Sequence, residues 1–408
     1  MTDAIFAAAL GVEKPWYVAS TQFDAGARLL TVKIDFKEGT RFSHASHAGT
    51  HPVYDSQTKR YRHLNFFQHE CYLEVRVPRV TLPDGRVAQV DLPWAGRLAG
   101  FTLLFEALVL QFCKDMPFNV VARLTGLSWH RVHAICERYV ELALDSVDLS
   151  ETTHVAIDET SSQRGQNYLT IAADAERRKV VYVTEGKGAD TIAGFADHLC
   201  AHGGDSAQII SVSIDMSAAF IKGVTTHLPN ARITFDKFHV VAAASDALNK
   251  TRRIEQRTDP DLKGMRWTLQ KDTSRLRAEE RAELDELITC VTTKRTARAW
   301  TYREDLREIL QRKQINVVTG MLHQWCTNVM RSKVEPMKDV ARMIRKHMDG
   351  IVAWTQTRQT NGFIEAINGL FQAAKRRARG YTRFKTMRTV LFLIAGKLDF
   401  SHLNPHAA

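Results

Sequence analysis

Hydrophobic and polar residues alternate along the N-terminal part of the chain with the period of β-strands. Residues 29–34 and 72–77 carry an apolar side chain at about every second position, as strands with one buried face do. A Pro-Asp-Gly turn signal at 83–85 precedes a further apolar run at 87–90. We therefore predict a small β-rich module over residues 1–95.

From residue 101 the apolar pattern changes to the period of helices. The predicted helices cover 101–113, 119–125 and 129–144. Between the last two, Ala122 allows close helix contact, Gly126 allows a sharp turn, and Ser128 caps the next helix. This spacing predicts a helix-turn-helix over residues 96–148, and a plain helical hairpin is the alternative. The residues at the start of its recognition helix, which we predict to contact DNA, are Trp129, His130, Arg131 and His133.

The next part of the chain alternates strands with helices. The predicted strands cover 154–158, 168–173, 179–184, 208–214 and 231–235, and the predicted helices cover 190–202 and 217–227. Three strands, a helix, a strand, a helix and a strand are the order of an RNase H-like domain. In such a domain the first three strands form an antiparallel meander, and parallel strands are added by crossovers. We predict the first part of this core over residues 149–240.

The remainder of the chain is helical in pattern. Residues 241–355, with breaks near Pro260, Lys271 and Pro336, are predicted to form an all-helical insertion. Residues 356–408 are predicted to complete the core with helices at 359–380 and 384–396. The first of these helices ends in basic residues suited to phosphate contact, namely Lys375, Arg376, Arg377 and Arg379. The predicted fold is therefore a multi-domain α/β protein.

Charge changes this picture by indicating an anionic partner. The 408 residues include 56 Lys and Arg against 45 Asp and Glu, a formal net charge of +11. Such a balance favours nucleic acid or a membrane surface as partner, and a basic protein without a polyanion partner is the alternative. The most apolar stretch is shorter than the ~20 residues of a membrane span. Six cysteines occur singly, which is typical of reduced thiols, so we expect a cytoplasmic protein.

Two acidic residues end apolar runs that we predict to be strands. Asp158 follows residues 155–157, and Asp215 follows residues 209–214. A carboxylate at the end of a buried strand loses hydration, which costs several kcal/mol unless a cation or a donor meets it. Two such carboxylates repel each other, and a hard divalent ion such as Mg²⁺ or Mn²⁺ removes the repulsion. The alternative is that each aspartate caps the turn or helix that follows.

A third acid lies on the late basic helix. Glu365 shares one helix face with Asn361 and Asn368, so the three form a polar stripe. Phe363, Ile364 and Ile367 are expected to pack on the sheet. A solvated glutamate paired with a lysine is the alternative for Glu365.

An ordered set of segments resembles the DDE transposases of bacterial insertion sequences, specifically the ISL3 group, over roughly residues 40–400. The segments are 61–64 (YRHL), 77–80 (VPRV), 93–95 (PWA), 101–106 (FTLLFE), 157–161 (IDETS), 213–217 (SIDMS), 235–240 (FDKFHV) and 361–368 (NGFIEAIN). The resemblance implies that Asp158, Asp215 and Glu365 are the catalytic residues and the metal ligands, with two Mg²⁺ or Mn²⁺ ions as cofactors.

The resemblance also implies the activity and the partners. We expect metal-dependent cleavage at the ends of an insertion sequence and transfer of the 3′-hydroxyl into target DNA. The expected partners are double-stranded DNA, as inverted repeats and as target, and other copies of the chain, in a homodimer or higher oligomer on DNA. We expect no membrane partner. The protein would act in the bacterial cytoplasm, associated with the nucleoid when DNA-bound.

Two further parts of the sequence bear on this resemblance. Asp236 ends a strand and His239 follows, and because Glu365 fills the third ligand place, we interpret both, with Asn361 and Asn368, as supporting residues around the site. The family's N-terminal module usually binds zinc through cysteines. In the corresponding places this chain carries His44, His47 and His51. The module is therefore zinc-ribbon-like, but a fourth ligand is missing because that position falls near Leu82 or Gly85. This favours a solvated histidine cluster over a metal site, and zinc is not assigned.

Two other functions stay open from the sequence. An RNase H-like nuclease or junction resolvase would cleave DNA without strand transfer. A helix-turn-helix regulator would bind DNA with purely structural acids.

Overall fold

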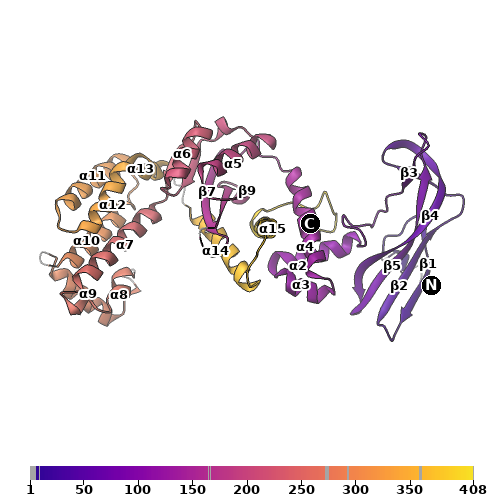
Figure 1. Cartoon of the computed structure of the whole chain (residues 1–408), viewed down its shortest axis with the longest axis horizontal. Coiled ribbons are helices and arrows are strands. Elements are labelled where there is room, and N and C mark those ends of the chain that lie inside the picture. The colour runs from indigo at the N-terminus through magenta and orange to yellow at the C-terminus, as the bar shows by residue number, and fades with distance from the viewer. Residues whose placement is uncertain are drawn as a thin grey trace. The chain divides into compact units, whose positions relative to one another are not determined.

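The computed structural model consists of two compact units. It describes residues 6–8, 10–163, 165, 167–271, 275–291, 294–357 and 361–407. One unit comprises Met1–Val147 with Phe371–Ala408, and the other comprises Asp148–Leu370. Both combine a sheet with helices, so the chain is a mixed α/β protein (Figure 1). The finer domain boundaries expected from the sequence stay predictions.

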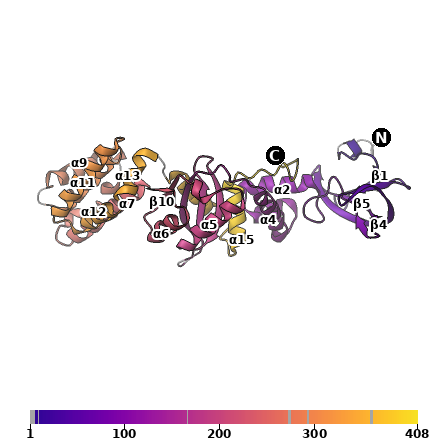
Figure 2. The ribbon, with the colours of Figure 1, turned by 90° about the horizontal axis from the view of Figure 1, so that it is seen from above.

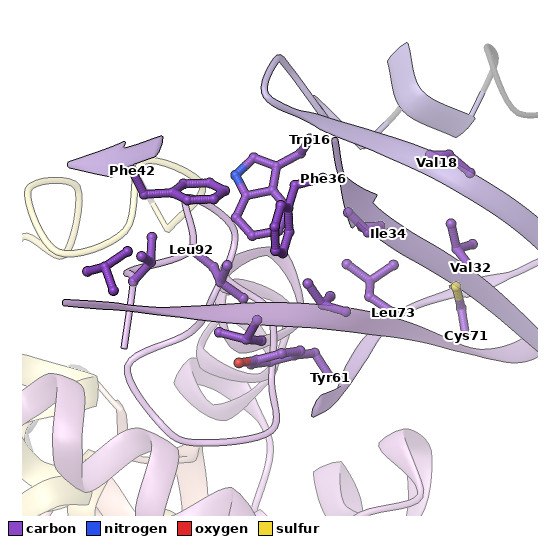
Figure 3. Packing of buried hydrophobic residues seen from close by; sticks show 14 of the residues in the cluster. Trp16, Val18, Val32, Ile34, Phe36, Phe42, Tyr61, Cys71, Leu73 and Leu92 are labelled. Atoms are coloured by element: carbon purple, nitrogen blue, oxygen red, sulfur yellow. The ribbon is translucent and has the colours of Figure 1, made fainter. Parts of the chain in front are cut away.

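The first unit contains a six-stranded sheet. Its strands are β1 Trp16–Asp24, β2 Leu29–Phe36, β3 Arg41–His44, β4 His47–Phe66, β5 His69–Thr81 and β6 Val87–Gln89. Their order is β1-β2-β5-β4-β3, β6 pairs with β5, and only β2 and β5 run parallel. On one face of the sheet, the Trp16 ring lies 5.6 Å from that of Phe36 and 5.3 Å from that of Phe42 (Figure 3). The β-rich character predicted for this part of the chain is therefore confirmed.

The helices of the first unit follow this sheet in the chain. They are α2 Leu103–Asp115, α3 Phe118–Thr125, α4 Trp129–Asp145 and, from the C-terminal segment, α15 Phe384–Ala395. The buried Glu106 of α2 organises the preceding loop, because its carboxylate accepts hydrogen bonds from the backbone N–H groups of Arg97 and Leu98, each at 2.7 Å. The Tyr139 hydroxyl of α4 donates to the same carboxylate at 2.7 Å.

The second unit is built on a five-stranded sheet. Its strands are β7 His154–Ser161, β8 Tyr168–Asp174, β9 Lys179–Glu185, β10 Ser211–Ile214 and β11 Arg232–Phe235. Their order is β11-β10-β7-β8-β9. The first three strands form an antiparallel meander, and β10 runs parallel to both β7 and β11. Helices α5 Ala189–Ala201 and α6 Ala218–His227 make the two crossovers. The predicted order of strands and helices is confirmed.

The remaining helices of this unit come between β11 and the late basic helix. They are α7 Lys237–Glu255, α8 Arg266–Gln270, α9 Ala278–Thr289, α10 Arg295–Ile309, α11 Ile315–Arg331, α12 Glu335–Lys346 and α13 Met348–Thr357. Helix α7 packs on α10 and α12, and α11 packs on α12 and α13 (Figure 2). The predicted all-helical character of this segment is confirmed for its described residues.

The structure corrects several predicted boundaries. The fourth strand of the second unit starts at Ser211, not at residue 208, because Ser206–Gln208 form a 3-10 turn capped by Asp205. Helix α14 covers Gly362–Arg377 and does not reach Gly380, because Arg379 and Gly380 adopt positive φ angles of 61° and 103°. Its predicted first residues, 359 and 360, lie outside the described residues.

No helix among the described residues is long and apolar enough to cross a membrane.

Candidate functional site

Three aspartates stand in a row across neighbouring parallel strands of the second unit. The last paired residues of β10 with β7 are Ser213 and Ala156, and Ile214 pairs with Phe235 of β11. Asp215 and Asp236 directly follow β10 and β11, and Asp158 lies at the level where β10 ends. Neighbouring strands lie roughly 5 Å apart, so the backbones of the three aspartates are neighbours.

Asp158 is buried in a position that disfavours its negative charge. Its side chain is 9% exposed, and its carboxylate accepts hydrogen bonds from the Glu159 N–H at 2.8 Å and the Asn368 side-chain amide at 2.7 Å. The pKa of Asp158 is raised to about 6, mainly because its side chain is buried and in smaller part because the carboxylates of Asp215 and Glu365 lie near it. A cation bound here would stabilise the ionised form of Asp158, because it would offset both the loss of hydration and the repulsion from the other carboxylates.

Glu365 and Asp215 are the two acids that influence Asp158, and they come from two other parts of the unit. Glu365 lies in the first turn of α14, with its side chain 45% exposed and its Oε1 3.9 Å from Nε2 of His239. Asp215 is partly buried, and its Oδ1 accepts a hydrogen bond from the Ser217 N–H at 2.9 Å. The local contact of Asp215 is thus the capping that the sequence left open as the alternative role.

Asp236 and Asn361 join the sheet to the two helices that flank the acids. The wholly buried Asp236 accepts hydrogen bonds from the Phe238 N–H at 2.8 Å and the Asn361 N–H at 2.5 Å. The Asn361 side chain accepts one from the Ser213 hydroxyl at 2.5 Å. Through these bonds, Asp236 fixes the start of α7 and the start of α14 relative to β10 and β11.

Three polar atoms around the acids are buried without a hydrogen-bond partner in the described part of the chain. They are Nε2 of His239, Nδ2 of Asn361 and Oδ1 of Asn368. A buried polar atom without a partner is costly, so such atoms concentrate where a substrate or an ion completes a site. Within the described ranges, however, no three His, Cys, Asp or Glu side chains are grouped closely enough to hold one metal ion. Asp158 is therefore near enough to Asp215 and Glu365 for their charges to act on it, but the described acids do not form a metal-ligating group.

Helices α3 and α4 of the first unit have the geometry expected of a helix-turn-helix. Gly126 ends α3 with a positive φ of 71°, and the Ser128 hydroxyl accepts a hydrogen bond from the Arg131 N–H at the start of α4. Ala122 is buried where the helices meet. The local features read from the sequence are therefore present.

The candidate DNA-contact residues of α4 differ in what they touch. His130 is exposed, whereas Trp129 stacks on His133 with ring centroids 5.1 Å apart. Nε2 of His133 lies 3.1 Å from the Thr386 hydroxyl. The Arg131 guanidinium donates to the Ala99 carbonyl at 3.0 Å and lies 4.3 Å from the centroid of the Phe101 ring. Arg131 and His133 therefore have structural contacts in addition to any contact with DNA.

Two basic residues that the sequence did not single out gather near the same helix. Burial lowers the pKa of His133, and the positive charges of Arg383 and Lys385 lower it further. The Lys385 side chain is 78% exposed. The signal was present in the sequence as two basic residues at the start of the predicted helix 384–396, but only the fold shows that they lie close to α4.

The basic residues at the end of α14 also have distinct surroundings. Arg376 and Arg379 are exposed, and burial of part of its side chain lowers the pKa of Lys375. The Arg377 guanidinium donates to the Asp115 carbonyl at 3.1 Å. Arg376 and Arg379 are therefore the more available of the four predicted phosphate contacts.

The three N-terminal histidines surround the hairpin of β3 and β4. His44 and His47 each have Nδ1 2.8 Å from the Ser46 hydroxyl, and Nε2 of His47 lies 3.6 Å from the Asp84 carboxylate. His51 is buried, with its ring centroid 6.3 Å from that of His47. In the described part of the chain these residues do not form a metal-ligating group. The zinc-ribbon-like character of the module stays a prediction.

Comparisons with known proteins agree on one family. A family model described as a transposase, of the DDE type and the ISL3 group, matches residues 155–391, which is more than half of the chain. A second model, described as the helix-turn-helix domain of transposase family ISL3, matches residues 90–140.

Two relatives extend the similarity over most of the chain. The transposase for insertion sequence element IS1001 of Bordetella parapertussis is 25% identical over 338 residues, covering 81% of this chain and 82% of the relative. The transposase for insertion sequence element IS1557 of Mycobacterium tuberculosis is 27% identical over 412 residues, covering 92% of each.

Proposed function

The chain belongs to transposase family ISL3, and from this premise we propose that it binds the ends of an insertion sequence, cleaves DNA there and joins the freed 3′-hydroxyl to target DNA. The two relatives are transposases for insertion sequence elements, which supports this activity. Both ends of an element must be held together during joining, so the proposal includes a homodimer or higher oligomer on DNA.

We infer that the second unit has an RNase H-like core. The inference is supported by its strand order β11-β10-β7-β8-β9, with an antiparallel meander followed by two parallel strands. Asp158 lies in β7, the central strand of this order, and Asp215 directly follows the neighbouring strand β10. An all-helical insertion separates them in sequence from α14, which carries Glu365.

In this proposal Asp158, Asp215 and Glu365 are the catalytic residues and hold two divalent ions, Mg²⁺ or Mn²⁺. The observation that carries it is the burial of Asp158 beside two other carboxylates that raise its pKa. Carboxylate oxygens are the ligands that these ions prefer, so the donor set fits. The ions, when bound, supply activation of the attacking oxygen and neutralisation of the leaving oxygen.

The surrounding residues support the three acids in this scheme. Asn368 orients the Asp158 carboxylate through its amide hydrogen bond. His239 faces Glu365 and would attract its carboxylate when the imidazole is protonated. Asp236 and Asn361 hold the start of α14, so Glu365 reaches the acids from a fixed direction. In other metal sites, removing hydrogen bonds to the ligands typically weakens metal binding by about 10- to 100-fold.

We propose that the first unit recognises the DNA ends. A helix-turn-helix of this kind inserts its second helix in the major groove, and α4 is that helix here. Among the residues predicted from the sequence, His130 and Arg131 are exposed and are the candidates for base contact. Lys385 and Arg383, Arg376 near the end of α14, and Arg379 just after it are candidates for contact with phosphates. This attraction weakens as the salt concentration rises.

The test uses duplex oligonucleotides taken from the DNA that flanks the gene. Binding, cleavage, and joining of a precleaved 3′-hydroxyl end are measured for Asp158→Asn, Asp215→Asn and Glu365→Gln. We expect all three variants to bind the duplex and to lose cleavage and joining. Asp197→Asn, an exposed acid of α5 in the same unit, is the matched control and should retain both activities. Cleavage by the three variants at the rate of the unsubstituted chain would overturn the assignment of the catalytic residues. If the unsubstituted chain cleaves the DNA but does not join the precleaved end, the result would favour a nuclease.

A further inference from the structure

A hollow of about 350 Å³ lies next to the start of α7, and we refer to it as the α7 hollow. This volume is within the range of small-ligand sites. The residues that matter for its chemistry are Lys237, Phe238, Gln270, Arg303, Arg307 and Gln311. All of them belong to the second unit. The combination of an aromatic ring, cations and side-chain amides is the set that protein sites use for a nucleotide.

Phe238 is the unusual member of this set. Its side chain is 54% exposed although the first turn of α7 is firmly fixed, since the Phe238 N–H donates to the buried Asp236 carboxylate at 2.8 Å. The backbone of Phe238 is therefore fixed, and its large apolar ring is held at the surface. Nζ of Lys237 lies 5.6 Å from the centre of this ring and 4.0 Å from that of Trp354. An exposed ring with a cation beside it can stack on a base whose phosphate is close.

The charge of the α7 hollow favours an anion. Arg303 and Arg307 both pair with one carboxylate, that of Glu304, and Lys237 adds a third positive charge. Among the described residues, no Asp or Glu lines this hollow. Two other hollows of the same unit differ, because acids line both of them, including Asp339 in one and Glu283 in the other. Of these three hollows, the α7 hollow is the one suited to a phosphate group.

The α7 hollow and the candidate catalytic acids both involve residues in the first turn of α7. Phe238 is followed by His239, whose Nε2 lies 3.9 Å from Oε1 of Glu365. Consecutive Cα atoms are about 3.8 Å apart, so the stacking ring and the residue that faces Glu365 come from the same turn of α7. A DNA strand held at the acids therefore passes within one nucleotide or a few of Phe238.

We propose that the α7 hollow binds one unpaired nucleotide of the DNA strand on which the acids act. The base stacks on Phe238, the side-chain amides of Gln270 and Gln311 reach the edge of the base, and Lys237 and Arg307 hold the phosphate. This inference rests on the proposed function for its DNA substrate. It adds that the strand must be locally unpaired near the acids, and that the energy of unpairing is recovered by stacking.

The test measures binding in EDTA, so that no strand is cut. Fluorescence anisotropy compares a short labelled duplex carrying a bulge of two unpaired thymines with the fully paired duplex of the same sequence. The unsubstituted chain is expected to bind the bulged duplex more tightly. Phe238→Ala should weaken binding to the bulged duplex by about 5- to 150-fold, which is the equivalent of ~1–3 kcal/mol per stacked base. Its affinity for the paired duplex should not change.

Two variants serve as controls. Phe238→Trp keeps a stacking ring and should retain the preference for the bulge. Trp267→Ala removes another exposed aromatic ring of the same unit, one that lines a different hollow, and should leave the preference unchanged.

The outcomes separate this inference from the proposed function. If the Phe238→Ala chain binds each duplex as tightly as the unsubstituted chain does, the proposed nucleotide site in the α7 hollow is wrong. The proposed transposase function would be unaffected. The same holds if Phe238→Ala changes only self-association, because the ring would then be part of a protein interface. Failure of the unsubstituted chain to bind either duplex would overturn both.

Discussion

Replacing Asp236 by alanine should destabilise the second unit far more than the loss of an ordinary helix cap. The Asp236 carboxylate is wholly buried and accepts one hydrogen bond from the first turn of α7 and another from the Asn361 N–H at the start of α14. Loss of the cap costs about 1 kcal/mol, and a buried N–H without a partner costs about 1–3 kcal/mol. We expect the free energy of unfolding to fall by about 2–4 kcal/mol in total.

The assay is urea unfolding followed by circular dichroism and by tryptophan fluorescence. Asp205→Ala is the matched control, because Asp205 also caps a turn by accepting a hydrogen bond from a backbone N–H but is exposed. It should lose about 1 kcal/mol at most. Equal losses for both variants would refute the bridging role of Asp236. A folded and fully stable Asp236→Asn variant without cleavage activity would refute it differently, since that result is the one expected of a metal ligand.

Three further predictions concern other contacts. Burial holds the pKa of His63 at about 4 against an ordinary value of 6.5, so its neutral form contributes stability that is present above pH 6.5 and is lost as pH falls toward 4. The loss should reach about 3 kcal/mol, and His63→Gln should flatten the pH dependence of the urea midpoint. Gly96→Ala would put a Cβ atom 2.4 Å from Cδ of Glu106, so it should lower the melting temperature, whereas Gly320→Ala, with open space around it, should not. Asn368→Ala should raise the Mg²⁺ concentration for half-maximal cleavage by about 10- to 100-fold without changing DNA affinity, as metal titrations of cleavage and binding would measure.

Much of the fold could be predicted because hydrophobic period and chain order are local properties. The strands that contain or precede Asp158, Asp215 and Asp236 were recognisable as apolar runs, and their order with the helices matched that of an RNase H-like domain. The late helix of Glu365 was recognisable from its alternation of apolar and polar faces. The choice of Glu365 as the third candidate acid came from the resemblance to the DDE transposases and not from this pattern.

The contacts that support the acids could not be predicted, because they join residues far apart in the chain. The hydrogen bond from the Asn361 N–H to Asp236 spans more than a hundred residues, and no periodic pattern reports it. The carbonyl that Arg131 reaches, that of Ala99, depends likewise on how a loop returns to α4. The end of α14 was placed too late because the positive φ of Arg379, a residue type that rarely adopts it, has no strong signal in the sequence.

Changing the metal preference of the site by substituting Glu365 tests the central claim most directly. A sulfur ligand disfavours Mg²⁺ and accepts softer ions such as Mn²⁺. Cleavage by Glu365→Cys is therefore measured in each metal, with Asp197→Cys as the control for an added thiol. The account predicts that Glu365→Cys does not cleave in Mg²⁺ and recovers cleavage in Mn²⁺. Cleavage in Mg²⁺ at the rate of the unsubstituted chain, or no gain in Mn²⁺, would contradict a role of this glutamate as metal ligand.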